Sequence, residues 1–249
     1  MADKKEHKIV SADSGKTVTS AKKPAAKPAQ KPNVVAAKPV GNAGSLRAGA
    51  VVLWVVAVIF EVLALLVVLG KINLKFMPTL GQLIVLLVLD LACVIIGSQL
   101  WKKANHIKPA SEANKLKFWL WNNMGVIVCV IAFVPIIILM LTNKDLDKKT
   151  KTIAVVAAAV ALLIGGAASI DYNPVSVEQQ QAAMEAITTE VYWAPFGKVY
   201  HTHEDCQALN QSDTLTVGDV EQAIAANRTR LCSFCAKRDA IEGVVTDGE

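Results

Sequence analysis

The sequence predicts a predominantly α-helical membrane protein, with a four-helix transmembrane bundle and a small α+β domain at its C-terminal end. Four long apolar runs between residues 48 and 170 predict the bundle. Of the 249 residues, 53% are hydrophobic, which exceeds the roughly 45–50% typical of soluble proteins. After the last run the chain turns polar, and three of its five cysteines follow close together. That grouping predicts a small, separately built domain.

The first 47 residues predict a disordered basic tail. They hold ten Lys and Arg against three acidic residues, and they are rich in Ala, Pro and Val without an amphipathic period. Such a composition is typical of an extended chain. Two interpretations remain open. The tail is either a solvated tether or an arm held to anionic lipid, where each Lys near the surface contributes about 1 kcal/mol.

Each apolar run is long enough to span a bilayer, because about 20 helical residues cross a hydrocarbon core of roughly 30 Å. The connections between them are short, which predicts antiparallel neighbours packed as one bundle over residues 48–170. The fourth run is rich in Ala and Gly and favours close helix–helix contact. The predicted spans are residues 48–69, 80–100, 118–141 and 153–170.

The distribution of Lys and Arg predicts the orientation. With the N-terminus inside, the tail and the second loop place fifteen basic residues on the cytoplasmic side, against six in the first and third loops. Cytoplasmic loops of membrane proteins carry this excess. We therefore expect a multi-pass protein of the cell membrane with both termini in the cytoplasm.

Two acidic residues lie near the middle of predicted spans, Glu61 in the first and Asp90 in the second. A carboxylate at that depth costs about 2.5–3.5 kcal/mol on insertion scales, so such residues face the bundle interior. One interpretation is a proton or ion site between the two spans. The other is interhelical hydrogen bonding that stabilises packing.

The polar segment 171–190 predicts a helical neck, and residues 191–242 predict the small domain. Within it, Pro195-Phe196-Gly197 between two β-type runs predicts a hairpin. A short helix is expected farther on, with Thr216 as its N-cap. The chain then reaches Cys232-Ser233-Phe234-Cys235.

Four residues of this domain predict a Zn²⁺ site: His201, Cys206, Cys232 and Cys235. Two cysteines separated by two residues can ligate one metal through a tight turn, and His201 with Cys206 completes a tetrahedral N/S set. Thiolates favour zinc over Mg²⁺ or Ca²⁺. His203 is a competing imidazole, and a disulfide among the three cysteines is the alternative for an extracellular domain.

The same residues carry a family resemblance. The segments FGKVYHTHEDCQAL and RLCSFCA resemble a small zinc-binding module of bacterial proteins that is similar to the metal domain of the Ada DNA-repair protein. The matching residues are Gly197, Lys198, Tyr200, His201, Cys206, Leu209, Cys232 and Cys235. The resemblance implies a small zinc-binding α+β fold over about a fifth of the chain. It departs from the Ada domain itself, which uses four cysteines and a reactive thiol.

These features favour an interaction or sensory platform, in which a structural zinc module is anchored to the cytoplasmic face of a membrane. Its expected partners are membrane lipid and a protein partner or a second copy of the chain. Residues 171–249 hold thirteen acidic against five basic residues, which argues against nucleic-acid binding. No phosphate loop, metalloprotease motif or nucleophile elbow occurs in the sequence, so no enzyme is predicted. The alternative is a small oligomeric transporter or channel that uses Glu61 and Asp90.

Overall fold

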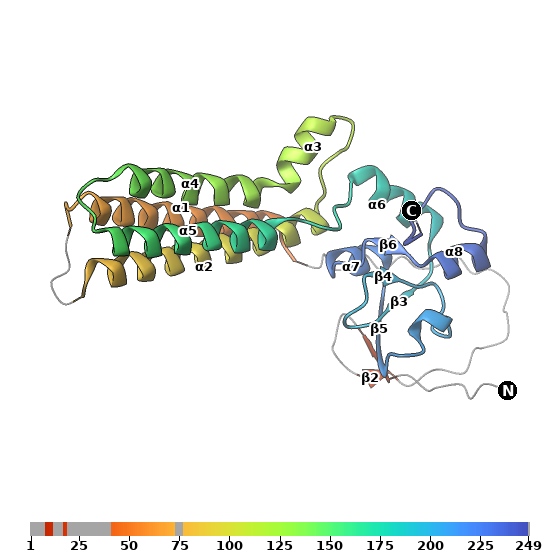
Figure 1. Cartoon of the computed structure of the whole chain (residues 1–249). Helices are drawn as coiled ribbons and strands as arrows, with labels where there is room; N and C mark the ends of the chain where they lie inside the picture. The colour runs from red at the N-terminus through yellow and green to blue at the C-terminus, as the bar shows by residue number, and fades with distance from the viewer. Residues whose placement is uncertain (1–7, 12–16, 19–40, 73–76, 249) are drawn as a thin grey trace. The chain divides into compact units, whose positions relative to one another are not determined.

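The computed structural model describes residues 8–11, 17–18, 41–72 and 77–248 (Figure 1). The chain divides into two compact units. One is a helical unit of residues 43–105 and 112–174. The other, here called the soluble unit, combines residues 106–111 and 175–248 with the described N-terminal residues 8–11, 17–18 and 41–42.

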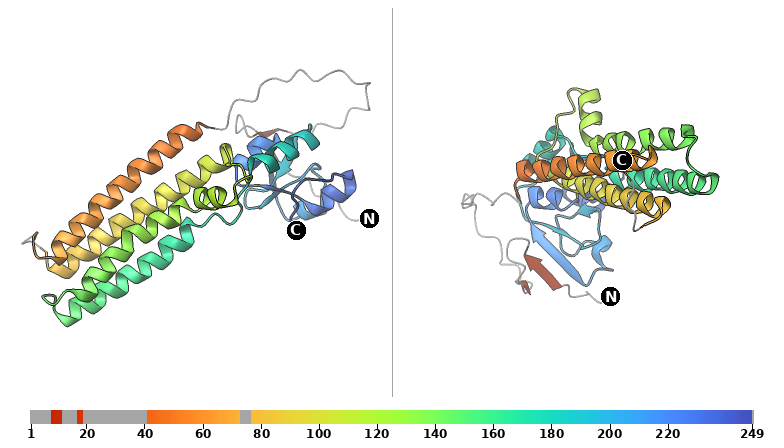
Figure 2. Two further views of the ribbon diagram at one scale, coloured as in Figure 1. Left: turned by 90° about the horizontal axis from the view of Figure 1, so that it is seen from above. Right: turned by 90° about the vertical axis from the view of Figure 1, so that its left-hand side faces the viewer.

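The helical unit contains four long helices that run side by side (Figures 1 and 2). Each of the four is long and apolar enough to cross a membrane, which confirms the predicted fold class of this part. The helices are α1 (Ala43–Val68), α2 (Thr79–Ile107), α4 (Met124–Thr142) and α5 (Lys148–Ser169).

The third apolar run differs from the single helix expected over residues 118–141. A short helix, α3 (Lys115–Asn122), ends before Asn123, and α4 begins after it. The side-chain amide of Asn123 donates to the carbonyl of Trp119 at 2.9 Å. Asn side chains compete in this way for backbone groups and favour helix ends.

Small residues bring the bundle helices together. The hydroxyl of Ser169 on α5 donates to that of Ser98 on α2 at 2.9 Å, and both side chains are buried. Gly125 of α4 lies against this pair. Close contact through Gly and Ser is the usual packing mode of membrane helices.

One end of the bundle contains an aromatic cluster around Arg47. The guanidinium carbon lies 5.7 Å from the ring centroid of Trp101 and 5.3 Å from that of Trp121. Nη2 of Arg47 donates to Oδ1 of Asn105 at 3.2 Å. Trp54 also packs on Trp101, with centroids 5.3 Å apart. Cation–π contacts with two indole rings and a hydrogen bond to an amide therefore stabilise the guanidinium of Arg47.

The soluble unit contains short helices and two small sheets. Its first helix, α6 (Val177–Ala186), begins with a capping box between Ser176 and Gln179; it covers only part of the neck expected at residues 171–190. The remaining elements of this part of the chain are β3 (Val191–Trp193), β4 (Val199–Tyr200), the 3₁₀ helix η1 (Gln207–Leu209), β5 (Thr214–Gly218), α7 (Val220–Ala225), β6 (Arg230–Leu231) and α8 (Ser233–Asp239).

Two strands of the soluble unit come from the segment expected to be a disordered tail. They are β1 (Lys8–Ser11) and β2 (Thr17–Val18), and they complete a sheet with the strand order β2-β1-β5-β3. The rest of residues 1–40 lies outside the described part. The segment KIVS has only two β-type residues, Ile9 and Val10, and gave no signal strong enough to predict a partner about 200 residues away.

The N-cap expected at Thr216 is wrong. Thr216 lies inside β5, and α7 begins after Asp219, whose carboxylate accepts the amide N–H of Gln222 at 2.7 Å. In return, Oε1 of Gln222 accepts the amide N–H of Asp219 at 3.0 Å. This reciprocal pair satisfies two backbone donors at the helix start, which makes Asp219 the better cap.

The domain packing also continues past the expected boundary at residue 242. The amide N–H of Leu231 donates to the carbonyl of Val245 at 3.0 Å, and that of Asp247 donates to the carbonyl of Leu231 at 3.2 Å. Residues 245–247 thus line one side of β6. Val244 joins the buried core, which also includes Trp193, Tyr200 and Leu215.

Candidate metal centre

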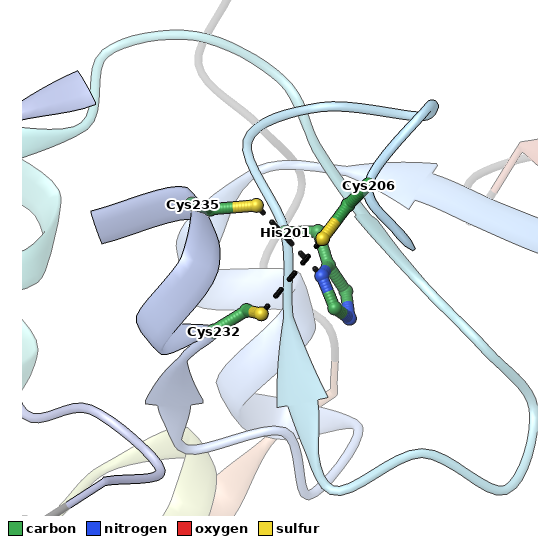
Figure 3. Close-up of side chains that lie close together, drawn as sticks. All are labelled: His201, Cys206, Cys232 and Cys235. Carbon is green, nitrogen blue, oxygen red and sulfur yellow. Dashed lines mark hydrogen bonds between the residues drawn. The ribbon is translucent and has the colours of Figure 1, made fainter. Parts of the chain in front are cut away.

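His201, Cys206, Cys232 and Cys235 lie together in the soluble unit, and all four side chains are buried (Figure 3). One donor atom from each residue lies within 4.8 Å of the others. The structure therefore brings together one imidazole and three sulfurs from two separate segments of the sequence.

Two of the spacings between donors match the edge of a tetrahedral metal site. Sγ of Cys206 lies 3.9 Å from Sγ of Cys232, and Sγ of Cys235 lies 3.8 Å from Nδ1 of His201. A tetrahedron with metal–sulfur bonds of about 2.3 Å has edges of about 3.8 Å. All donor pairs lie within 4.8 Å, so a metal ion would bind all four once the more widely spaced donors moved closer together.

Strand pairing delivers two of the donors. β4 and β6 are parallel, with Val199 opposite Arg230 and Tyr200 opposite Leu231. His201 and Cys232 are the next residues of the two strands, so the register places them at the same end of the pair. Tyr200 and Leu231 are both fully buried, which holds that register from within the core.

The predicted hairpin positions the histidine. Tyr192 and His201 form an antiparallel bridge and exchange both backbone hydrogen bonds, at 2.7 and 2.8 Å. The turn between them contains Pro195 and Gly197, as the sequence suggests. Cys206 follows in a loop, where its amide N–H donates to the carbonyl of His203 at 3.3 Å.

The start of α8 holds the remaining pair. Cys232 is the N-cap residue and Cys235 lies in the first turn, with the amide N–H of Ala236 donating to the carbonyl of Cys232 at 2.9 Å. The carboxylate of Asp247 accepts the amide N–H of Ser233 at 2.7 Å. Thiolates at this position gain from the positive end of the helix dipole.

Burial controls the protonation of the donors in the absence of an ion. It lowers the pKa of His201 to about 4, against a weaker opposing effect of Asp247. It raises the pKa of Cys206 to about 12. Burial also raises the pKa of Cys232 above its usual value. The imidazole is then neutral and ready to ligate at neutral pH, while the two thiols must lose protons when a metal binds.

The structure separates the two candidate histidines. Nε2 of His203 lies 2.6 Å from Oδ1 of Asp239, and His203 is not part of the donor cluster. The hydroxyl of Thr202 donates to the other carboxylate oxygen of Asp239. The imidazole of His201 thus faces the sulfurs. His203 contacts Asp239 and so connects the loop that follows His201 to the end of α8.

The disulfide alternative is not formed, because all five cysteines are free. The sulfur spacing of 3.9 Å between Cys206 and Cys232 is far beyond the S–S bond length of about 2.05 Å. Cys93 and Cys129 lie in α2 and α4 and do not belong to the cluster.

The two membrane acids lie in the bundle and contribute nothing to this cluster. Glu61 of α1 and Asp90 of α2 are both buried and are close enough to interact electrostatically. Oδ1 of Asp90 has no hydrogen-bond partner within the described residues. The interhelical hydrogen bond expected as one interpretation is therefore not made by this oxygen.

The sequence interpretation missed two supporting carboxylates, Asp239 and Asp247. Asp239 anchors the His203 loop, and Asp247 caps α8 from beyond the expected domain boundary. Neither residue lies at a sequence spacing from the ligands that indicates its role, because each contacts a residue that is brought close only by folding. Only Asp219 had a readable signal, as the first residue of the capping sequence Asp-Val-Glu-Gln.

The donor chemistry admits soft and borderline transition metals and disfavours Mg²⁺ and Ca²⁺, which take oxygen ligands. A possible metal-binding cluster and four apolar helices together describe a membrane protein with a metal module. Comparison with known proteins adds no family: no family model, no curated protein and no solved structure matches the chain.

Proposed function

We propose that this chain is an integral membrane protein whose soluble unit is a structural zinc module, serving as a cytoplasmic interaction or sensory platform. The observation that carries the proposal is the complete donor set of His201, Cys206, Cys232 and Cys235, all buried and within 4.8 Å of one another. Four protein ligands leave no open coordination position for substrate or water, which favours a structural over a catalytic ion.

Zinc is the metal that we propose for this set. One imidazole and three thiolates are a common ligand set of structural zinc, and zinc is redox-inactive, so it does not oxidise its sulfur ligands. The likeness to the Ada-like module points to the same metal. Because the domain is small, binding free energy of about 10–16 kcal/mol, as in zinc-finger peptides, would supply much of its stability.

The platform role follows from what the module offers at its surface. Phe196 is 99% exposed in the turn of the hairpin, and Arg228 donates to the carbonyls of Ala194 and Pro195, which precede Phe196 in that turn. Aromatic side chains are enriched in protein–protein interfaces, and we propose Phe196 as a contact residue of the platform. The proposed partners are membrane lipid and a protein partner or a second copy of the chain.

The location follows from charge. Both termini are proposed to lie in the cytoplasm of a cell carrying the protein in its plasma membrane, where reducing conditions keep thiols available for metal. Enzymatic activity and nucleic-acid binding are not part of the proposal.

The test is metal analysis of the full chain purified in detergent. We expect one zinc per chain in the wild type and none in Cys235→Ser, with Cys93→Ser retaining the wild-type content as a matched control. Affinity capture from the native membrane should then recover a partner with wild type and with Cys93→Ser, and lose it with Cys235→Ser. A wild-type chain without metal, or one whose partner survives Cys235→Ser, would refute the platform.

A second candidate function, a small oligomeric transporter or channel, is favoured by the buried Asp90 oxygen that lacks a partner within the described residues. An unsatisfied carboxyl in the bundle interior is costly and often marks an ion or proton path. Flux measured in liposomes decides this candidate. Glu61→Gln and Asp90→Asn should abolish a flux that wild type supports, whereas equal flux in all three chains removes the acids from any path.

A further inference from the structure

One strand of the soluble unit is bordered by a segment from the opposite end of the sequence. β5 pairs with β3 on one side, antiparallel, and with β1 on the other side, parallel. The register matches Lys8 with Thr214, Ile9 with Leu215, Val10 with Thr216 and Ser11 with Val217. All four apolar helices lie between the two strands in sequence.

Without β1, that side of β5 would be a sheet edge. An edge strand presents a row of unpaired N–H and C=O groups, which accept an additional strand. Many domains bind extended peptides in this manner, with main-chain hydrogen bonds giving affinity and alternate side chains giving specificity. β5 is five residues long and Leu215 is buried in the core. The core contact holds β5 in place, so its edge can pair with another strand.

Charge favours the same pairing. Residues 1–47 hold ten basic and three acidic residues, whereas residues 171–249 hold thirteen acidic and five basic ones. Opposite charge of this size accelerates encounter and selects partners. The N-terminal segment therefore pairs with β5 in backbone register and is opposite in charge to residues 171–249.

We propose that the outer edge of β5 is a strand-docking site for an extended basic segment, and that the N-terminal arm, residues 1–42, is its resident occupant. The inference rests on the proposed platform function and names its docking surface and the chemistry of its ligand. A tethered strand acts at an effective concentration of about millimolar, so the arm keeps the edge closed against weaker strands. It also requires the arm and the soluble unit to lie on the same side of the membrane.

The arm can be displaced by two prolines. Because successive β1 residues direct their N–H groups to opposite neighbours, Ile9→Pro/Val10→Pro removes one donor towards each side whichever way the strand faces. The matched control is Val34→Pro/Val35→Pro, which makes the same chemical change within the arm but outside the bounds of β1 and β2.

The experiment uses the full chain in detergent and two readouts. Hydrogen exchange is measured over residues 214–218, and binding is measured for a fluorescent peptide with the sequence of residues 1–20. In Ile9→Pro/Val10→Pro, we expect exchange to rise and peptide affinity to increase by about tenfold or more over wild type, since the tethered competitor has gone. Raising the salt concentration should lower the affinity of the peptide, because salt screens the attraction between opposite charges. The control should behave as wild type.

Unchanged exchange at residues 214–218 in Ile9→Pro/Val10→Pro would overturn the proposal, and so would peptide binding that is absent or equal in wild type and variant. Zinc content measured on the same samples keeps the two proposals separate. A chain that loads zinc but fails these readouts refutes only the docking site, whereas a chain that lacks zinc refutes the platform itself.

Discussion

The carbonyl of Tyr200 accepts the amide N–H of Cys232 at 2.9 Å, so the residue before the histidine donor is joined directly to the first cysteine of the Cys-x-x-Cys turn. This bond continues the β4–β6 pairing by one residue into the donor cluster. The histidine and the thiol thus share one rigid backbone support, although 30 residues separate Tyr200 from Leu231 in its paired strand. The geometry of the metal centre depends on this pairing as much as on the donors.

Replacing one thiol donor should remove the metal and unfold the soluble unit. Cys232→Ser takes away a completely buried sulfur, and a structural zinc site contributes about 10–16 kcal/mol in small peptides. We expect loss of bound zinc together with loss of near-ultraviolet circular dichroism from Trp193, while the helical signal of the bundle remains. Cys93→Ser is the control, and retention of zinc by Cys232→Ser would contradict the assignment.

The two histidines should behave differently. His201→Gln removes a ligand and should abolish zinc binding, whereas His203→Gln removes only the contact with Asp239. Because that contact is partly exposed, its loss should cost about 1 kcal/mol of stability and leave the zinc content unchanged. Metal analysis and thermal unfolding of both variants check this. Loss of zinc in His203→Gln alone would reverse the assignment.

Two bundle glycines should tolerate alanine unequally. A Cβ at Gly97 would lie 2.6 Å from Nε1 of the buried Trp54 and 3.2 Å from the carbonyl oxygen of Ala50, whereas nothing lies within 4 Å of one at Gly166. Overpacking of this kind costs about 1–3 kcal/mol. Gly97→Ala should therefore lower the unfolding midpoint in detergent titrations. The unfolding midpoint of Gly166→Ala should equal or exceed that of wild type. If Gly97→Ala and Gly166→Ala had the same midpoint, the close contact between α1 and α2 would be contradicted.

The capping box of α7 should have a measurable value. Asp219→Ala removes the carboxylate that accepts the N–H of Gln222 at 2.7 Å, and such caps contribute about 0.5–2 kcal/mol. We expect a lower unfolding temperature of the soluble unit with its zinc still bound. Glu185→Ala, at an exposed position of α6, should stay within about 0.5 kcal/mol of wild type. Equal effects of the two changes would argue against the cap.

The membrane part of the fold was the easier part to predict. Twenty apolar residues in a row have few alternatives to a spanning helix, so the number of helices followed from hydropathy. The break at Asn123 did not, because a single polar residue in an apolar run gives no decisive signal and the helix end depends on its side-chain contact with Trp119. Helix boundaries shift where such local bonds compete.

The metal centre was predictable for a different reason. A metal admits few donor types and few spacings, so His201, Cys206, Cys232 and Cys235 could be grouped from sequence alone. The distinction between His201 and His203 needed the pairing of Tyr192 with His201, which only the folded hairpin reveals. The pairing of β1 with β5 lay beyond reach, because strand partners distant in sequence leave no local trace.

If the cluster binds a metal, the order of its donors along the chain makes metal loading depend on the progress of translation. His201 and Cys206 emerge after the last apolar helix, and the shell closes only when Cys235 has been made. A polypeptide interrupted before Cys232 would insert the entire bundle yet present just one half of the chelate. A bound metal would therefore mark a chain that has been synthesised through Cys235, whereas shorter fragments would present an unfolded tail to proteases.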